Sequence, residues 1–151
     1  MAQFTVEEIP ATVVVTIRRK VPLAELTEFF GSAFGQVMAA VSQAGGSPGG
    51  PPFGWYHGVP TDTADVSAGF PVVGDVHTPD GGVRVQERPG GRCVVGLHVG
   101  SYDTLDDTYR DLDVFLTAHG LTPAEEMWEE YLSPPEGDPS RWETRVVQPL
   151  A

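Results

Sequence analysis

The stretch Ala11-Thr-Val-Val-Val-Thr-Ile17 decides how this chain folds, because its pattern returns later in the sequence. The apolar residues at 13, 15 and 17 alternate with their neighbours, which predicts a half-buried β-strand. Eighty residues further on, Cys93-Val-Val-Gly-Leu97 alternates in the same way. A second strand with the same pattern at this distance indicates that the chain contains an internal duplication.

A helical pattern follows each of these strands. Apolar residues at positions i, i+4, i+7 and i+11 predict one stripe of an amphipathic helix in the first half, and adding 79 to each number finds the same spacing in the second half. These stripes consist of Leu26, Phe30, Ala33 and Val37, and of Leu105, Tyr109, Leu112 and Leu116.

The correspondence continues after the helices. Residues 53–57 and 127–131 both resemble short aromatic strands, each followed by a turn that contains proline, and a last strand closes each half. Each half is therefore predicted as strand–helix–strand–strand, over about 4–72 and about 82–149. We predict one α+β domain over residues 1–151, in which the halves share an antiparallel sheet with both helices on one face and a ligand cleft at the pseudo-twofold seam.

Composition restricts the function. The formal net charge is −12 and the chain has only nine Lys and Arg residues, which argues against a nucleic-acid partner. No apolar run is long enough to span a membrane, and no export signal is evident at the start, so we expect a cytoplasmic location. The oligomeric state stays open between a monomer and a weak dimer.

The pentapeptide Trp128-Glu-Glu-Tyr-Leu132 carries the most chemical information. Side chains alternate along a strand, so one carboxylate lies among bulky apolar groups on each face. A carboxylate surrounded by aromatic rings loses hydration and attracts a cation, and the rings add cation–π attraction, so the pair favours flat lipophilic cations. An edge strand with solvated glutamates and ordinary core aromatics remains the alternative.

Other chemistries lack support in the sequence. The four histidines show no metal-ligand spacing, and no Gly-x-Ser-x-Gly motif is present. The glycine pairs do not fall between a strand and a helix as a phosphate-binding loop requires. We therefore expect neither a metal nor a cofactor.

Several segments, in order along the chain, resemble the GyrI-like or AraC-type effector-binding domain family. The segments are Glu8-Ile-Pro-Ala-Thr-Val-Val-Val15, Ala68-Gly-Phe-Pro-Val72, Pro89-Gly-Gly91, Gly100-Ser-Tyr102, Trp128-Glu-Glu-Tyr-Leu132 and Trp142-Glu-Thr144. The resemblance implies two fused strand–helix–strand–strand units with a central ligand cleft. It also implies that Glu129 rather than Glu130 contacts the ligand, together with Tyr131. By position in such a fold, the aromatic walls are expected at Tyr56, Phe70, Tyr102 and Trp142.

The resemblance implies three functions. The first is binding of lipophilic, often cationic aromatic molecules, as in multidrug regulators, although no helix-turn-helix segment precedes the first strand here. The second is hydrolysis of cyclopropane-bearing antibiotics, with Glu129 as general base and Tyr131 stabilising developing charge. The third is interaction with DNA gyrase. Residues alone do not separate the first two functions, because the same carboxylate serves both.

Overall fold

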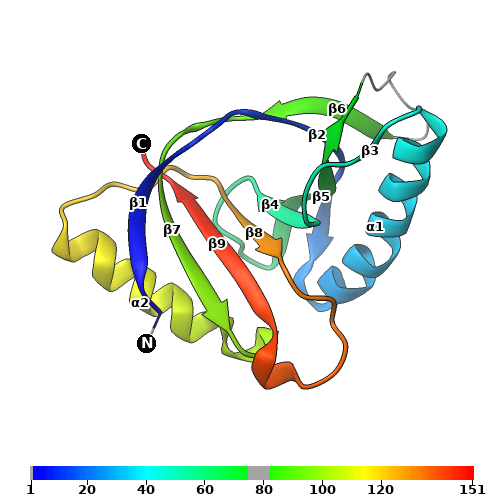
Figure 1. Ribbon diagram of the computed structural model, residues 1–151. Coiled ribbons are helices and arrows are strands. Elements are labelled where there is room, and N and C mark those ends of the chain that lie inside the picture. Colours follow the sequence, from blue (N-terminus) through cyan, green and yellow to red (C-terminus); the bar gives the residue numbers. More distant parts are fainter. Residues whose placement is uncertain (1, 75–81) are drawn as a thin grey trace.

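The computed structural model describes residues 2–74 and 82–151, and Figure 1 shows the arrangement of its elements. Short 3-10 turns precede both helices (η1, Leu23–Glu25; η2, Tyr102–Thr104) and the last strand (η3, Pro139–Arg141). The strands and helices are β1 (Phe4–Ile9), β2 (Thr12–Pro22), α1 (Leu26–Gln43), β3 (Ser47–Pro48), β4 (Phe53–Tyr56), β5 (Thr63–Val73), β6 (Val83–Arg88), β7 (Gly91–Val99), α2 (Leu105–Ala118), β8 (Met127–Tyr131) and β9 (Glu143–Pro149).

The described strands form one antiparallel sheet in the order β1-β7-β9-β8-β4-β5-β2-β6, with β3 added beside β5. This arrangement confirms the predicted α+β class with a single antiparallel sheet. The two halves meet where β4 pairs with β8. The outermost strands are exchanged between the halves, because β1 lies beside β7 and β6 lies beside β2.

Both helices cover the same face of the sheet, as the residue pairing shows. Directly paired residues lie on one face of a sheet. One row of such pairs crosses eight strands in the order Val83, Ile17, Ala68, Gly54, Glu129, Val146, Gly96, Phe4. Val83, Ile17 and Ala68 belong to the core under α1, whereas Val146 and Phe4 belong to the core under α2. Glu129 therefore lies between the two helix-covered cores.

The row also corrects the spacing of the duplication. Ile17 and Gly96 occupy mirrored places in it, 79 residues apart, so the strands follow the same offset as the helices and not the offset of 80. The difference of one residue moves Cys93 and Val95 to the opposite face from Val15 and Ile17. At the seam, Gly54 and Glu129 occupy equivalent places in the two halves. They are paired directly with each other and are 75 residues apart in the sequence.

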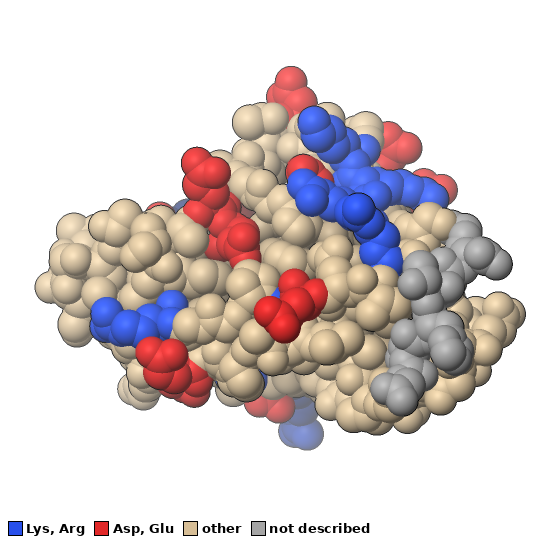
Figure 2. All heavy atoms as spheres, turned by 90° about the horizontal axis from the view of Figure 1, so that it is seen from above, with Lys and Arg blue, Asp and Glu red and all other residues tan. Residues whose placement is uncertain are grey.

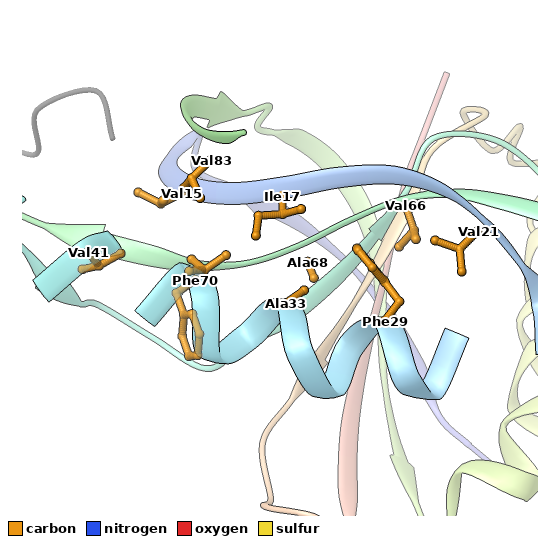
Figure 3. Close-up of a cluster of buried hydrophobic side chains, with 11 residues drawn as sticks. Val15, Ile17, Val21, Phe29, Ala33, Val41, Val66, Ala68, Phe70 and Val83 are labelled. Carbon is orange, nitrogen blue, oxygen red and sulfur yellow. The ribbon is translucent and has the colours of Figure 1, made fainter. Parts of the chain in front are cut away.

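The core under α1 is built from the predicted stripe, shifted slightly around the helix. Its buried residues are Phe29, Ala33, Val37 and Val41. Figure 3 shows Phe29, Ala33 and Val41 pointing from the helix to valines and isoleucine of the sheet. Phe30 is only half-buried, because it lies on the flank of the stripe that faces the seam.

A third core lies on the opposite face of the sheet. It contains Val14, Phe53, Trp55, Cys93, Val95, Trp128 and Val147. The guanidinium of Arg88 lies over the rings of Phe53 and Trp128, 4.6 and 4.4 Å from their centroids. Glu130 faces this core and lies 3.6 Å from Arg88. No helix within the described ranges is long and apolar enough to cross a membrane.

Candidate functional site

Glu129 forms the centre of the candidate site. It lies in the middle of the short strand β8 and points to the helix-bearing face, while its neighbours Trp128 and Glu130 point to the third core. Only 5% of its surface is exposed. Because Gly54 is its partner on β4, the carboxylate has no side chain opposite it across the seam.

Two tyrosine hydroxyls hold the carboxylate. Tyr131 donates a hydrogen bond of 2.8 Å to Oε1, and Tyr109 of α2 donates to Oε2. Burial raises the pKa of Glu129, and the two hydrogen bonds and the nearby His98 only partly oppose that rise. The group is therefore a carboxylate whose charge is poorly compensated by the protein.

All four tyrosines of the chain surround this carboxylate. Besides Tyr109 and Tyr131, the rings of Tyr56 on β4 and Tyr102 on η2 lie close enough to be affected by its charge. Burial raises the pKa of both hydroxyls, and the negative charge of Glu129 raises it further. The tyrosines consequently stay protonated at neutral pH and can act as hydrogen-bond donors.

Further aromatic rings line the side of the site next to α1. Phe30 and Phe34 stack at 5.6 Å, and each meets the ring of Tyr131 edge-on at 6.1 Å. On the other side, Tyr102 lies 5.8 Å from Tyr131 and 5.1 Å from Trp142. The carboxylate is thus enclosed by rings that come from both halves of the duplication.

Gly54 makes this arrangement possible. A Cβ atom at that position would lie 2.9 Å from the tip of the Phe30 ring and 2.9 Å from the hydroxyl oxygen of Tyr131. These distances are shorter than a carbon atom normally tolerates, so a side chain at 54 would displace both rings. The absence of a side chain at residue 54 leaves the space above β4 to the two rings.

The structure brings most of the residues named from the sequence together. Tyr56, Tyr102 and Tyr131 surround Glu129, and Trp142 extends the cluster through its contact with Tyr102. Phe70 belongs instead to the core under α1, with 8% of its surface exposed, and its ring meets Phe34 edge-on at 5.8 Å.

Sequence reasoning missed Tyr109, Phe30 and Phe34 as site residues. Phe30 and Tyr109 were assigned to helix stripes, which are normally core positions. Their equivalent places, 79 residues apart, were the signal that could have found them, because two flanking positions related by a pseudo-twofold axis face the same seam.

Charged side chains are unevenly distributed over the surface. Figure 2 shows Lys and Arg side chains clustered on one part of the face it displays, with Asp and Glu side chains more scattered. Arg18 and Arg84 are exposed on the face of the sheet opposite to Glu129, and Arg18 is held by Asp65 at 2.8 Å. Within the described part of the chain, no three His, Cys, Asp or Glu residues are grouped to hold a metal ion.

Chemically, the site combines one buried negative charge with aromatic faces and hydroxyl donors. A lipophilic cation would neutralise the carboxylate without restoring its hydration. A carboxylate with a raised pKa is also suited to remove a proton from water.

The whole chain is similar to a known family and to several solved structures. The model of the GyrI-like family, described as a GyrI-like small molecule binding domain, matches residues 2–151. No curated protein sequence matches the chain.

Several solved structures share the fold. The C-terminal domain of EcmrR is 22% identical, with a TM-score of 0.83 over 100% of this chain and 98% of that one. A hydrolase encoded by lin2189 from Listeria innocua is 18% identical, with a TM-score of 0.75 over 99% and 92% of the chains. SAV2435, solved with bound tetraphenylphosphonium, is 9% identical, with a TM-score of 0.74 over 99% and 94%. The chain spans 57% of the EcmrR chain solved in a complex with DNA.

Proposed function

This chain belongs to the GyrI-like small-molecule-binding domain family, and from that premise we propose that it binds lipophilic aromatic cations with Glu129 as their counter-ion. One observation carries the proposal: Glu129 is buried, and no Lys or Arg in the described ranges forms an ion pair with it. The other buried glutamate, Glu130, has two arginine partners.

The physical argument is one of charge compensation. A buried carboxylate without a cationic partner is costly, so a ligand that brings a positive charge recovers part of that cost. The surrounding rings contribute cation–π attraction of roughly 0.5–2 kcal/mol each. A small hydrated cation loses too much hydration on entering such a site, whereas a cation shielded by its own aromatic groups loses little.

The proposed entry of the ligand is past Tyr102, which is 38% exposed, and its half-buried neighbour Trp142. A ligand entering here displaces rings rather than filling an open cavity. Tetraphenylphosphonium is a suitable probe, because it is a lipophilic aromatic cation and is the molecule bound in the similar structure of SAV2435.

The test is calorimetric titration of the protein with tetraphenylphosphonium and with tetraphenylborate, an anion of the same shape. We expect binding of the cation only. Glu129→Gln keeps the shape and removes the charge, so cation affinity should fall about 10- to 100-fold, equivalent to about 1.4–2.8 kcal/mol. Glu143→Gln, which removes one charge from an exposed position on β9, should leave affinity unchanged. Equal binding of both ions, or full affinity in Glu129→Gln, contradicts the proposal.

The affinity should also depend on pH. The cation pairs with ionised Glu129, whose pKa is raised by burial, so affinity should decrease as the pH falls through that raised value. The free energy of unfolding should depend on pH as well. The contribution of Glu129 is fully present below the pKa of an ordinary glutamate and is lost as the pH rises through the raised pKa of the folded state. Glu129→Gln should remove both dependences, which titrations and unfolding curves from about pH 4 to 8 would detect. An unchanged pH profile in the variant would assign the effect to another group.

A second candidate function is hydrolysis of a strained cyclopropane ring, for which the buried carboxylate of Glu129 beside the donating hydroxyl of Tyr131 is the supporting observation. Ionised Glu129 would take a proton from water while the water oxygen bonds to a ring carbon and a ring carbon–carbon bond breaks. The electrons of the broken bond would move to a carbonyl group of the substrate that is conjugated with the ring, and Tyr131 would donate a hydrogen bond to its oxygen. The proton on Glu129 would then pass to the product. Product analysis with a cyclopropanoid antibiotic decides between the two functions, since stoichiometric binding without turnover excludes the hydrolase.

A further inference from the structure

Two surface hollows of the protein are related by the duplication. The first, of about 250 Å³, lies beside the start of α1, and the second, of about 290 Å³, lies beside the start of α2. Six residues of the first have their counterpart 79 positions later in the second. They are Arg19, Lys20, Glu25, Glu28, Phe29 and Ser32, matched by His98, Val99, Thr104, Asp107, Thr108 and Asp111.

One pair of positions in the lining of the two hollows bears on the candidate site. Where the first half has the exposed Arg19, the second has His98, which is 4% exposed. The Nδ1 atom of His98 lies 2.6 Å from the hydroxyl oxygen of Thr108, and Nε2 lies 2.9 Å from the carbonyl oxygen of Ser101. A carbonyl oxygen only accepts, so Nε2 donates to Ser101, and in the neutral imidazole Nδ1 then accepts from Thr108.

Two of the three hydrogen-bond partners of His98 directly precede a tyrosine of the candidate site; the third is the hydroxyl of Thr104 in η2, 3.2 Å from Nε2. Ser101 is followed by Tyr102, and Thr108 is followed by Tyr109, which donates to Glu129. The counterpart of Thr108 in the first half is Phe29, which has no hydroxyl and is followed by Phe30. The second half, which contains His98, thus has Tyr109 at this helix position. The first half, which has Arg19 in place of the histidine, has Phe30 there.

We propose that His98 is a positioning residue, which ties η2 and the first turns of α2 to β7 and thereby holds Tyr102 and Tyr109 against Glu129. Apolar packing does not fix all turns of α2 against the sheet equally. Leu112 and Leu116 anchor the later turns of α2, whereas in the first turns Leu105 and Tyr109 are only partly buried against the same core and the buried residue is Thr108. The placement of Tyr109 therefore depends on the hydrogen bond between Thr108 and His98. The inference rests on the proposed function only where ligand affinity is measured.

The first arm of the test needs no ligand. The pKa of Glu129 is measured by carbon NMR of its carboxyl group in the wild type, Thr108→Val, Thr108→Ser, Tyr109→Phe and the double variant Thr108→Val/Tyr109→Phe. The groups that face this carboxyl are His98 of β7, Tyr56 of β4, Tyr102 of η2, Tyr109 of α2 and Tyr131 of β8.

We expect Thr108→Val, which keeps the side-chain shape, to raise the pKa of Glu129 by about 0.5–1 unit, because it loosens the hydrogen bond from Tyr109. Thr108→Ser should restore the wild-type value. In the Tyr109→Phe background, Thr108→Val should change nothing further, since its effect passes through the Tyr109 hydroxyl. An equal shift in that background, or no shift in Thr108→Val, overturns the proposal.

The second arm measures tetraphenylphosphonium affinity in the same variants. Thr108→Val should weaken binding about fivefold in the wild-type background and less than twofold in Tyr109→Phe. Arg19→Ala, at the position equivalent to His98, should leave affinity unchanged. If the wild type fails to bind the cation while the NMR coupling is present, the proposed ligand class is wrong and the role of His98 stands. Coupling absent from both arms overturns the role of His98.

Discussion

Replacing Arg88 by alanine is expected to destabilise the folded chain by about 3 kcal/mol, near the lower end of what removing one partner of a buried ion pair costs. Arg88 is 5% exposed, its guanidinium covers the rings of Phe53 and Trp128, and it lies 3.6 Å from Glu130. Its removal leaves a buried carboxylate with Arg145 as remaining arginine partner, at 3.3 Å and 36% side-chain exposure. That partner keeps the expected loss from being larger.

Denaturant unfolding curves measure this loss. Arg84→Ala is the matched control, because Arg84 lies on the same strand and the same face but is exposed, and its loss should change stability by less than about 0.5 kcal/mol. Adding Glu130→Gln to Arg88→Ala should recover part of the stability, since it removes the stranded charge. A loss below about 1 kcal/mol for Arg88→Ala would show that the ion pair and the ring contacts contribute little.

Gly54→Ala is expected to weaken tetraphenylphosphonium binding by at least about tenfold, or about 1.4 kcal/mol. The new methyl group would meet the ring of Phe30 and the hydroxyl of Tyr131, both at 2.9 Å. These are the free ends of side chains, so the fold can accommodate the methyl by turning the rings. The turned rings would occupy the space over Glu129 and loosen the hydrogen bond from Tyr131.

The control for this prediction is Gly35→Ala on the exposed side of α1, where an added Cβ has no neighbour within 4 Å. That change should leave affinity intact and stabilise the helix by up to about 1 kcal/mol. If Gly54→Ala binds the cation as tightly as the wild type, the ligand does not occupy the seam above β4.

The local patterns of the sequence were sufficient to predict the main strands and both helices. Alternation marked β2 and β7, and the apolar stripes marked α1 and α2, because side-chain direction repeats with a period that the residues themselves display. The alternation in Trp128-Glu-Glu-Tyr-Leu132 likewise showed that one glutamate lies on each face of β8. The expectation that Glu129 rather than Glu130 contacts the ligand came only from the family resemblance.

The pairing of strands lay beyond these patterns. Apolar alternation over Cys93-Val-Val-Gly-Leu97 favours an offset of 80 from residues 13, 15 and 17. A shift of one residue exchanges the two faces of the strand. Only the hydrogen-bonded sheet selects 79, and that choice decides which side chains of β7 face α2.

By itself the sequence determined the duplication, the α+β class and the single sheet, and it indicated residues 128–132 as the place where a carboxylate could lie among aromatic rings. The tertiary structure alone decided that Glu129 lies opposite Gly54 at the seam, that Tyr109 comes from the flank of α2 to hold it, and that Phe70 belongs to the core. The physical reason is that periodicity is a property of neighbouring residues, whereas these contacts join residues far apart in the chain, whose distances depend on how the strands pair.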